Sequence, residues 1–222
     1  MGTPIIVGHR GSSEGVTPNT VAAFKKAVEA GVDMVEVDIH RAKDGVMVVS
    51  HELPAIHREI SLIEEIVHLA SKHPIKIMLD LKEPGYEADF IKLVLKHLKP
   101  NQFVVSTLED ESVKAINDMG LGINVGLSLG RHKPKNKLRT RLSEVFPIKR
   151  AKRCGAKFLS ANYKLVRFGV LKRAQRAELP VYVWTVDDHN HIIRVLKDKR
   201  VEGLITNRPT LAVKLKQALE GN

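Results

Sequence analysis

Residues 5–39, IIVGHRGSSEGVTPNTVAAFKKAVEAGVDMVEVDI, contain a complete strand–helix–strand pattern. A short β-branched run, Ile5–Gly8, precedes an amphipathic stretch, Thr20–Ala30, and a second β-branched run follows at Met34–Ile39. Asn19 is placed to cap the helix and Gly31 to end it. A strand, a helix and a second strand in this order predict two parallel strands joined by a crossover helix.

The same alternation continues to the C-terminus. Six further strands are predicted at Ile75–Leu81, Phe103–Ser106, Gly122–Leu127, Lys157–Ser160, Val181–Val186 and Gly203–Thr206. Further helices are predicted at Leu62–Lys72, Asp89–Leu98, Glu111–Met119, Phe168–Ala177, His191–Lys199 and Leu211–Leu219. Eight strands alternating with helices predict an α/β protein with a closed (β/α)₈ (TIM) barrel. A doubly wound open sheet is the alternative, but no Gly-rich dinucleotide or Walker fingerprint supports it. The extra segment Val46–Val49 is predicted to return along the second strand as a hairpin.

Length and composition are those of an ordinary globular protein. The chain has 222 residues, 43% of them hydrophobic, and we expect residues 1–222 to form a single compact domain. No apolar run approaches the roughly 20 residues that span a bilayer. The N-terminal residues lack the pattern of a signal peptide, so a cytoplasmic location is expected. Cys154 is the only cysteine, which excludes an intramolecular disulfide.

The net charge of +11 favours anionic partners such as phosphate esters or an anionic membrane surface. Much of the excess lies in the segment Arg131–Arg153, which we interpret first as a solvated loop and helix face. Aromatic residues make up only 5% of the chain and none is interleaved with this segment. Because single-stranded nucleic acid is bound by stacking on aromatic rings, no nucleic-acid partner is expected.

Polar residues gather where the first two strands end. In a (β/α)₈ barrel the active site lies at the C-terminal ends of the strands. His9 and Arg10 follow the first strand directly. Side chains alternate along a strand, so Glu36 and Asp38 share one face of the second strand while valines occupy the other. Two carboxylates on one face repel each other unless a cation lies between them.

The next strand repeats the pattern. Asp80 and Lys82 share a face, so Asp80 completes a cup of three carboxylates. Oxygen ligands of this kind suit Mg²⁺, Ca²⁺ or Mn²⁺. His51 follows the Val46–Val49 segment and is expected at the same rim. The alternative is a structural network in which Glu36 pairs with Arg10 and Asp80 with Lys82. Three acids on one face with two histidines favour a functional site.

These residues resemble the glycerophosphodiester phosphodiesterase family nearly from end to end. That family has a His-Arg-Gly motif, an Asn-Thr helix start, an acidic pair, a Lys-Asp-Gly turn, a histidine, a Trp-Thr strand and a final Thr-Asp-x-Pro segment. The matching residues here are His9-Arg10-Gly11, Asn19-Thr20, Phe24, Glu36, Asp38, Lys43-Asp44-Gly45, His51, Trp184-Thr185 and Thr206-Asn207-Arg208-Pro209.

The resemblance implies a (β/α)₈ barrel enzyme that uses a divalent metal ion. Its reaction would be hydrolysis of a small-molecule glycerophosphodiester to glycerol phosphate and an alcohol. Under the resemblance, His9 and His51 are the acid–base pair, in either order. The remaining implied roles are metal binding for Glu36, Asp38 and Asp80, phosphate contact for Arg10 and Lys82, and a wall for the organic half of the substrate for Trp184.

Four positions depart from the family pattern. The family usually has Glu where Pro18 and Asp80 stand, and Asp where Glu52 and Asn207 stand.

The sequence leaves two alternative functions open. One is a lysophospholipase D acting on a polar lipid headgroup. The other is a non-catalytic barrel that binds anions or nucleic acid through Arg131–Arg153.

Overall fold

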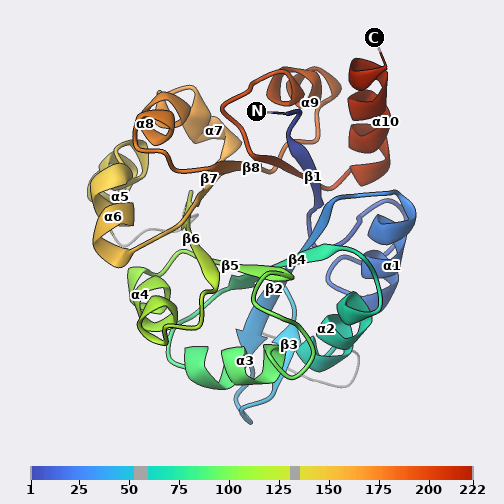
Figure 1. The fold of residues 1–222 in the computed structure, drawn as a ribbon, viewed down its shortest axis with the longest axis vertical. Coiled ribbons are helices and arrows are strands. Elements are labelled where there is room, and N and C mark those ends of the chain that lie inside the picture. The colour runs from blue at the N-terminus through green and yellow to red at the C-terminus, as the bar shows by residue number, and fades with distance from the viewer. Residues whose placement is uncertain (1, 53–59, 131–135, 222) are drawn as a thin grey trace.

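The computed structural model describes residues 2–52, 60–130 and 136–221. Eight parallel strands of this part of the chain close into a barrel ringed by helices (Figure 1). Around the ring, the strands are β1 (Ile5–Gly8), β2 (Met34–Arg41), β4 (Lys76–Leu81), β5 (Phe103–Thr107), β6 (Asn124–Leu129), β7 (Leu159–Asn162), β8 (Val181–Trp184) and β9 (Gly203–Thr206). Strand β1 pairs with both β2 and β9, which closes the ring. The predicted (β/α)₈ barrel is confirmed.

The helices form the outer layer. They are α1 (Val21–Glu29), α2 (Ile63–Ser71), α3 (Glu87–Val94), α4 (Asp110–Asp118), α5 (Lys137–Val145), α6 (Ile148–Cys154), α7 (Tyr163–Val166), α8 (Val170–Arg176), α9 (His189–Leu196) and α10 (Pro209–Glu220). The bounds of helices α5, α6 and α7 were not predicted, because these helices are short and contain lysines and arginines that obscure the apolar period. None of the helices in the described ranges is long and apolar enough to cross a membrane.

The short strand β3 (Met47–Val49) runs antiparallel to the end of β2, as predicted, and Ile39 lies opposite Val49. The next residue, Ser50, donates its backbone N–H to the Asp38 carbonyl at 3.1 Å. This return brings His51 back over the C-terminal end of β2. A segment outside the barrel strands is thereby placed at the barrel mouth.

The interior of the barrel is apolar at its N-terminal end and polar at its C-terminal end. The apolar part is a separate cluster within the ring, formed by Val7, Met34, Met78, Val104, Phe158, Tyr182 and Ile205. The rings of Phe158 and Tyr182 meet edge to face at 5.2 Å. The two rings fit because the residues beside them are glycines. A Cβ at Gly126 would lie 2.2 Å from Phe158, and one at Gly203 would lie 2.5 Å from Tyr182.

Gly126→Ala is therefore expected to destabilise the barrel by about 1–3 kcal/mol, because the added methyl group overlaps the Phe158 ring. Urea unfolding at neutral pH measures the loss. In a Phe158→Leu background, which removes part of the ring, the same substitution should cost less. Equal costs in the two backgrounds would show that this close contact does not limit packing.

Candidate active site

The three predicted acids meet at the C-terminal end of the barrel. Glu36 and Asp38 come from β2 and Asp80 comes from β4, where Asp38 and Asp80 are register partners. One carboxylate oxygen from each lies within 4.8 Å of the others. Glu36 and Asp38 are buried, and Asp80 is partly exposed. Strand alternation and register thus produce a cup of oxygen ligands that points into the barrel mouth.

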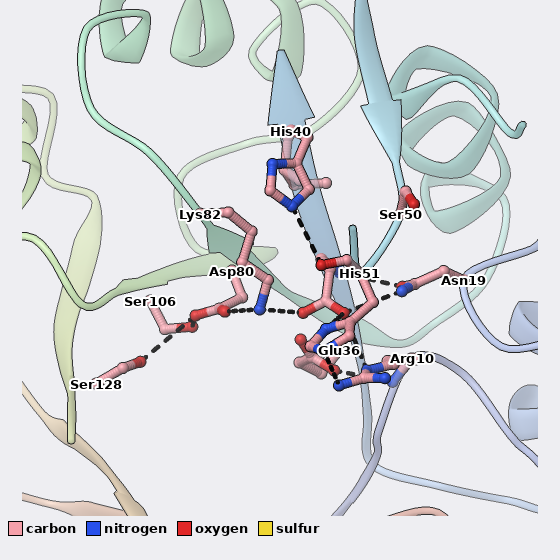
Figure 2. Close-up of polar contacts among 12 residues, drawn as sticks. Arg10, Asn19, Glu36, His40, Ser50, His51, Asp80, Lys82, Ser106 and Ser128 are labelled. Carbon is pink, nitrogen blue, oxygen red and sulfur yellow. Dashed lines mark hydrogen bonds and ion pairs between the residues drawn. The ribbon is translucent and has the colours of Figure 1, made fainter. Parts of the chain in front are cut away.

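Lys82 lies inside this acid cup. Its ammonium donates to the Asp80 carboxylate (Figure 2). It also forms an ion pair with Asp38 Oδ1. Burial alone would lower the pKa of Lys82, but the nearby Asp80 and Asp38 carboxylates outweigh burial and raise the pKa above its usual value. Lys82 is therefore a permanent cation that neutralises part of the acid cup.

The two buried acids on β2 differ strongly in their electrostatics. Burial and the adjacent Asp38 carboxylate raise the pKa of Glu36 well above its ordinary value. Burial also acts to raise the pKa of Asp38, but the hydrogen bond from His51 and the charges of Lys82 and Arg10 hold it well below the usual range. The ionised form of Glu36 thus lacks a sufficient counter-charge.

The acid cup fits a divalent cation. The buried Asp38 Oδ1 accepts no hydrogen bond of normal geometry among the described residues and faces the Lys82 ammonium only as an ion pair. The three ligands are all carboxylates, the donor set that Mg²⁺, Ca²⁺ and Mn²⁺ prefer. A cation there would also supply the counter-charge that ionised Glu36 lacks.

Asp38 also orients the groups around the acid cup. Its Oδ2 accepts hydrogen bonds from the Asn19 amide at 3.0 Å and from His51 Nδ1 at 3.1 Å. The Arg10 guanidinium lies 2.9 Å from the same oxygen. Because the Asp38 carboxylate can only accept a hydrogen bond, the ring of His51 carries a proton on Nδ1, and its Nε2 points away from Asp38.

Arg10 is held by an unusual backbone conformation. It has a φ of 55°, and its N–H donates to Glu36 Oε2 at 2.8 Å. Gly11 follows with a φ of 82°, and a Cβ there would lie 2.5 Å from the backbone of Ala23 in α1. This turn requires glycine and aims Arg10 over the acid cup. The guanidinium pairs with Asp38, whereas the structural alternative paired it with Glu36.

His9 is held on the other side by a chain of hydrogen bonds. Its Nδ1 lies 2.8 Å from Asn207 Oδ1, and the Asn207 amide nitrogen donates to Asp187 Oδ2 at 2.8 Å. Since the carboxylate fixes which way the amide points, Nδ1 of His9 must be the donor and Nε2 is left without a proton. That Nε2 lies 3.9 Å from Glu36 Oε2.

Burial, followed by the charge of Arg10, lowers the pKa of His9 to about 4. His9 is therefore neutral at pH 7. The hydrogen bond to Asn207 acts to raise this pKa, but the amide adds no negative charge beside the imidazole, as the family's usual Asp would. Both histidines thus have a hydrogen-bonded Nδ1, and the Nε2 of His51 lies 3.4 Å from the Arg10 guanidinium.

Asn207→Asp is expected to raise the pKa of His9 from about 4 towards the ordinary 6.5 in the metal-free protein. A carboxylate beside the ring favours the imidazolium, so the sign of the change is upward. Titration of the histidine resonances by NMR measures it. The exposed Asn190→Asp serves as the control for added charge. An unchanged His9 titration would contradict the hydrogen bond to residue 207.

Several site residues were missed by the sequence patterns. Asn19 was predicted to cap α1, but Thr20 is the cap, its Oγ1 accepting from the Ala23 N–H at 3.1 Å. Asn19 instead binds Asp38 through both its side-chain oxygen and nitrogen. Its place in the Asn-Thr motif was the available signal. That signal was ambiguous, because Asn at that position is also an ordinary helix cap.

Other missed residues support the acid cup from neighbouring strands. Ser106 and Ser128, at the ends of β5 and β6, donate to Asp80 Oδ1. His40 at the end of β2 lies 2.6 Å from Glu83 and 3.3 Å from the His51 carbonyl. A polar residue at a strand end was a signal for the serines, but only barrel closure assigns these partners.

Trp184 lies at the C-terminal end of the barrel, as the acid cup does, whereas a cavity opens at the other end. Trp184 ends β8, is partly buried, and donates its Nε1–H to the Ser160 carbonyl at 3.0 Å. A cavity of about 650 Å³ opens at the opposite, N-terminal end of the barrel, lined by residues such as Ile5, Lys76 and Lys157. It contains none of the clustered acids or histidines that we identify, so we assign the site to the C-terminal end on its chemistry.

Fold and site define a (β/α)₈ barrel protein with an oxygen-ligand metal cup and two histidines, a class suited to cleaving anionic esters. The profile of the glycerophosphoryl diester phosphodiesterase family matches residues 9–71 and 68–211, and the chain belongs to this family. The resemblance seen in the sequence is thereby confirmed.

Relatives and solved structures agree. A glycerophosphodiester phosphodiesterase of Caldanaerobacter subterraneus subsp. tengcongensis is 24% identical, over 95% of this chain and 97% of the relative. The crystal structure of a Parabacteroides distasonis glycerophosphodiester phosphodiesterase superposes with a TM-score of 0.81 at 17% identity, over 99% of both chains. An Oleispira antarctica phosphodiesterase, solved with its product sn-glycerol-3-phosphate, gives 0.76 at 16% identity, over 98% of this chain and 97% of that one.

Proposed function

We propose that this protein hydrolyses glycerophosphodiesters to glycerol phosphate and an alcohol, with a divalent cation held by Glu36, Asp38 and Asp80. The observation that carries the proposal is the acid cup flanked by His9 and His51, each oriented by a hydrogen bond at Nδ1. Family membership supports the same reaction. Because the barrel closes between β1 and β9, we also propose that residues 1–222 form one domain.

A phosphodiester carries a negative charge that repels a nucleophile. Arg10 and Lys82 border the acid cup and would donate to the non-bridging phosphate oxygens, where charge grows in the transition state. A bound divalent cation would supply Lewis-acid polarisation of the same oxygens. Trp184, at the end of β8, would wall the organic half of the substrate.

The hydrogen bonds support different roles for the two histidines. His9 is largely but not fully buried, neutral and paired with an amide, so it would accept the proton of the attacking hydroxyl, whether of water or of the substrate's own glycerol. His51 has a carboxylate partner for an imidazolium charge, and its side chain is 54% exposed against 13% for His9. We therefore infer that His51 acts as the imidazolium and delivers its Nε2 proton to the leaving alkoxide, which departs as the alcohol.

The test is hydrolysis of bis(p-nitrophenyl) phosphate, glycerophosphocholine and glycerophosphoethanolamine by metal-stripped protein. Activity that returns with added Mg²⁺, Ca²⁺ or Mn²⁺ supports the proposal and ranks both the metals and the headgroups. The absence of hydrolysis with every cation and substrate would overturn it and favour the non-catalytic anion-binding barrel.

A lysophospholipase D activity is the second candidate. Human lysophospholipase D GDPD1 is 48% identical over 46 residues, which cover 21% of this chain and 15% of the relative. Turnover of a lysophospholipid with none of glycerophosphocholine would favour this reading. A transient contact with an anionic membrane belongs to the same proposal. The cytoplasmic location stays a prediction, checked by cell fractionation.

A further inference from the structure

Helix α5 presents an apolar stripe to solvent. Leu138, Leu142 and Phe146 are 74%, 54% and 56% exposed. Their spacing of four residues places them along one face of the helix. Phe168, in the turn between α7 and α8, is 50% exposed as well. Large apolar side chains exposed together, rather than singly, mark a surface that meets a partner. We call these four residues the rim stripe.

The two phenylalanines of the rim stripe are joined by one arginine. The Arg173 guanidinium lies over the Phe146 ring at 4.2 Å and donates to the Phe168 carbonyl at 2.6 Å. A second arginine, Arg167, lies 4.9 Å from the centre of the Phe168 ring. The rim stripe is therefore continuous from α5 to the α7–α8 turn and is bordered by cations.

The net positive charge of the protein is concentrated in the segment that carries the rim stripe. Residues 136–177 contain 13 lysines and arginines and one acid, Glu144, a net charge of +12 against +11 for the full chain. Glu144 is buried, where it binds the Gly130 N–H and Arg141. Helices α5 to α8 lie together on one side of the barrel (Figure 1). The net charge of all the remaining residues together is close to zero.

The rim stripe lies at the catalytic end of the barrel. Helix α5 follows the C-terminal end of β6, and α7 follows that of β7, where the active sites of (β/α)₈ barrels are built. Glu144 anchors α5 to Gly130 just beyond β6 at 2.8 Å. Gly130 borders Trp184, since a Cβ there would lie 3.3 Å from the indole ring. The rim stripe thus adjoins the mouth on its Trp184 side.

We propose that the rim stripe and its surrounding cations dock the protein on an anionic lipid bilayer, with the barrel mouth facing the headgroups. The apolar side chains enter the interface, and the lysines and arginines contact anionic headgroups, as in other interfacial amphipathic helices. This inference rests on the proposed function, because docking there would bring a lipid-borne phosphodiester to the acid cup.

Two other occupants fit the surface less well. A second copy of the chain would bring two strongly positive faces together, which is unfavourable. Nucleic acid would match the charge of the surface. However, proteins bind it through phosphate contacts and stacked aromatic rings, and exposed leucines contribute to neither. A bilayer satisfies both the apolar and the cationic parts of the surface.

The experiment is sedimentation of the full chain with vesicles of phosphatidylcholine, with and without phosphatidylserine. We expect binding only when phosphatidylserine is present. The triple variant Leu138→Ser, Leu142→Ser, Phe146→Ser should bind at least about tenfold more weakly, since the anchor side chains are gone. Arg139→Glu with Arg167→Glu should weaken binding similarly, because the surface then repels anionic lipid.

Matched controls keep the result specific. Leu121→Ser removes an exposed leucine elsewhere, and Lys25→Glu with Lys92→Glu makes the same charge change on α1 and α3. Both controls should bind vesicles like the wild type. Hydrolysis of soluble bis(p-nitrophenyl) phosphate should be unchanged in the docking variants, so a failure of docking is separable from a failure of the proposed function.

Three outcomes would overturn the inference. The first is equal binding of the wild type to vesicles with and without phosphatidylserine. The second is unchanged binding of the triple serine variant. The third is a wild-type protein that does not bind vesicles and instead binds an RNA oligonucleotide or forms a dimer through this face.

Discussion

His9→Ala is expected to lower kcat for glycerophosphodiesters by about 10²–10⁴-fold, the usual contribution of one positioned proton-transfer group. The physical reason is the loss of a neutral imidazole whose free Nε2 faces the acid cup, fixed by the Asn207 amide and the Asp187 carboxylate. His51→Ala should cause a loss of similar size, since it removes the proton donor that Asp38 orients. Steady-state kinetics with saturating metal measures both.

The control is His68→Ala, which removes an exposed histidine of α2. It should retain the wild-type kcat. Circular dichroism and thermal unfolding should give native folds for all three variants, because neither site histidine lies in the apolar core. Hydrolysis close to the wild-type rate in either site variant would contradict the acid–base assignment.

Asp38→Asn should have the second large effect, a fall of at least about 10²–10³-fold in kcat together with weaker metal binding. Asp38 carries three functions at once: it is a candidate metal ligand, the partner of Arg10 and Lys82, and the acceptor that orients His51. The amide keeps the shape but removes the charge.

Calorimetric titration of metal-stripped protein with Mg²⁺, Ca²⁺ or Mn²⁺ measures the binding, and hydrolysis rates are measured in parallel. The exposed Asp89→Asn on α3 is the control and should behave as the wild type. If metal affinity and activity were both unchanged in Asp38→Asn, Asp38 would not belong to the site, and the proposed acid cup would be contradicted.

The fold and most of the site were predictable because they depend on local periodicity. Strands and helices alternate in the sequence, and eight repeats of that pattern leave a closed barrel as the simplest arrangement. Alternation along β2 places Glu36 and Asp38 on one face, and the same rule places Asp80 and Lys82. The motif glycine, Gly11, also has a local reason, since its backbone conformation excludes a side chain.

Helices α5 to α7 were not predictable in the same way. Their residues are rich in lysine and arginine, so the apolar period is weak, and α5 depends on the contact of Glu144 with Gly130. That contact joins a helix to the end of a strand. Tertiary packing of this kind overrides weak local preferences, which is why the exposed rim stripe emerges only from the folded chain.

The sequence by itself determined the barrel, the three acids and the two histidines, because strand alternation and strand ends are local properties. Only the tertiary structure decided how these groups are paired. Arg10 meets Asp38 and not Glu36, Lys82 enters the acid cup, and His9 meets Asn207 from 198 positions away. Such partners depend on register and barrel closure, which bring distant strand ends together and which no local pattern encodes.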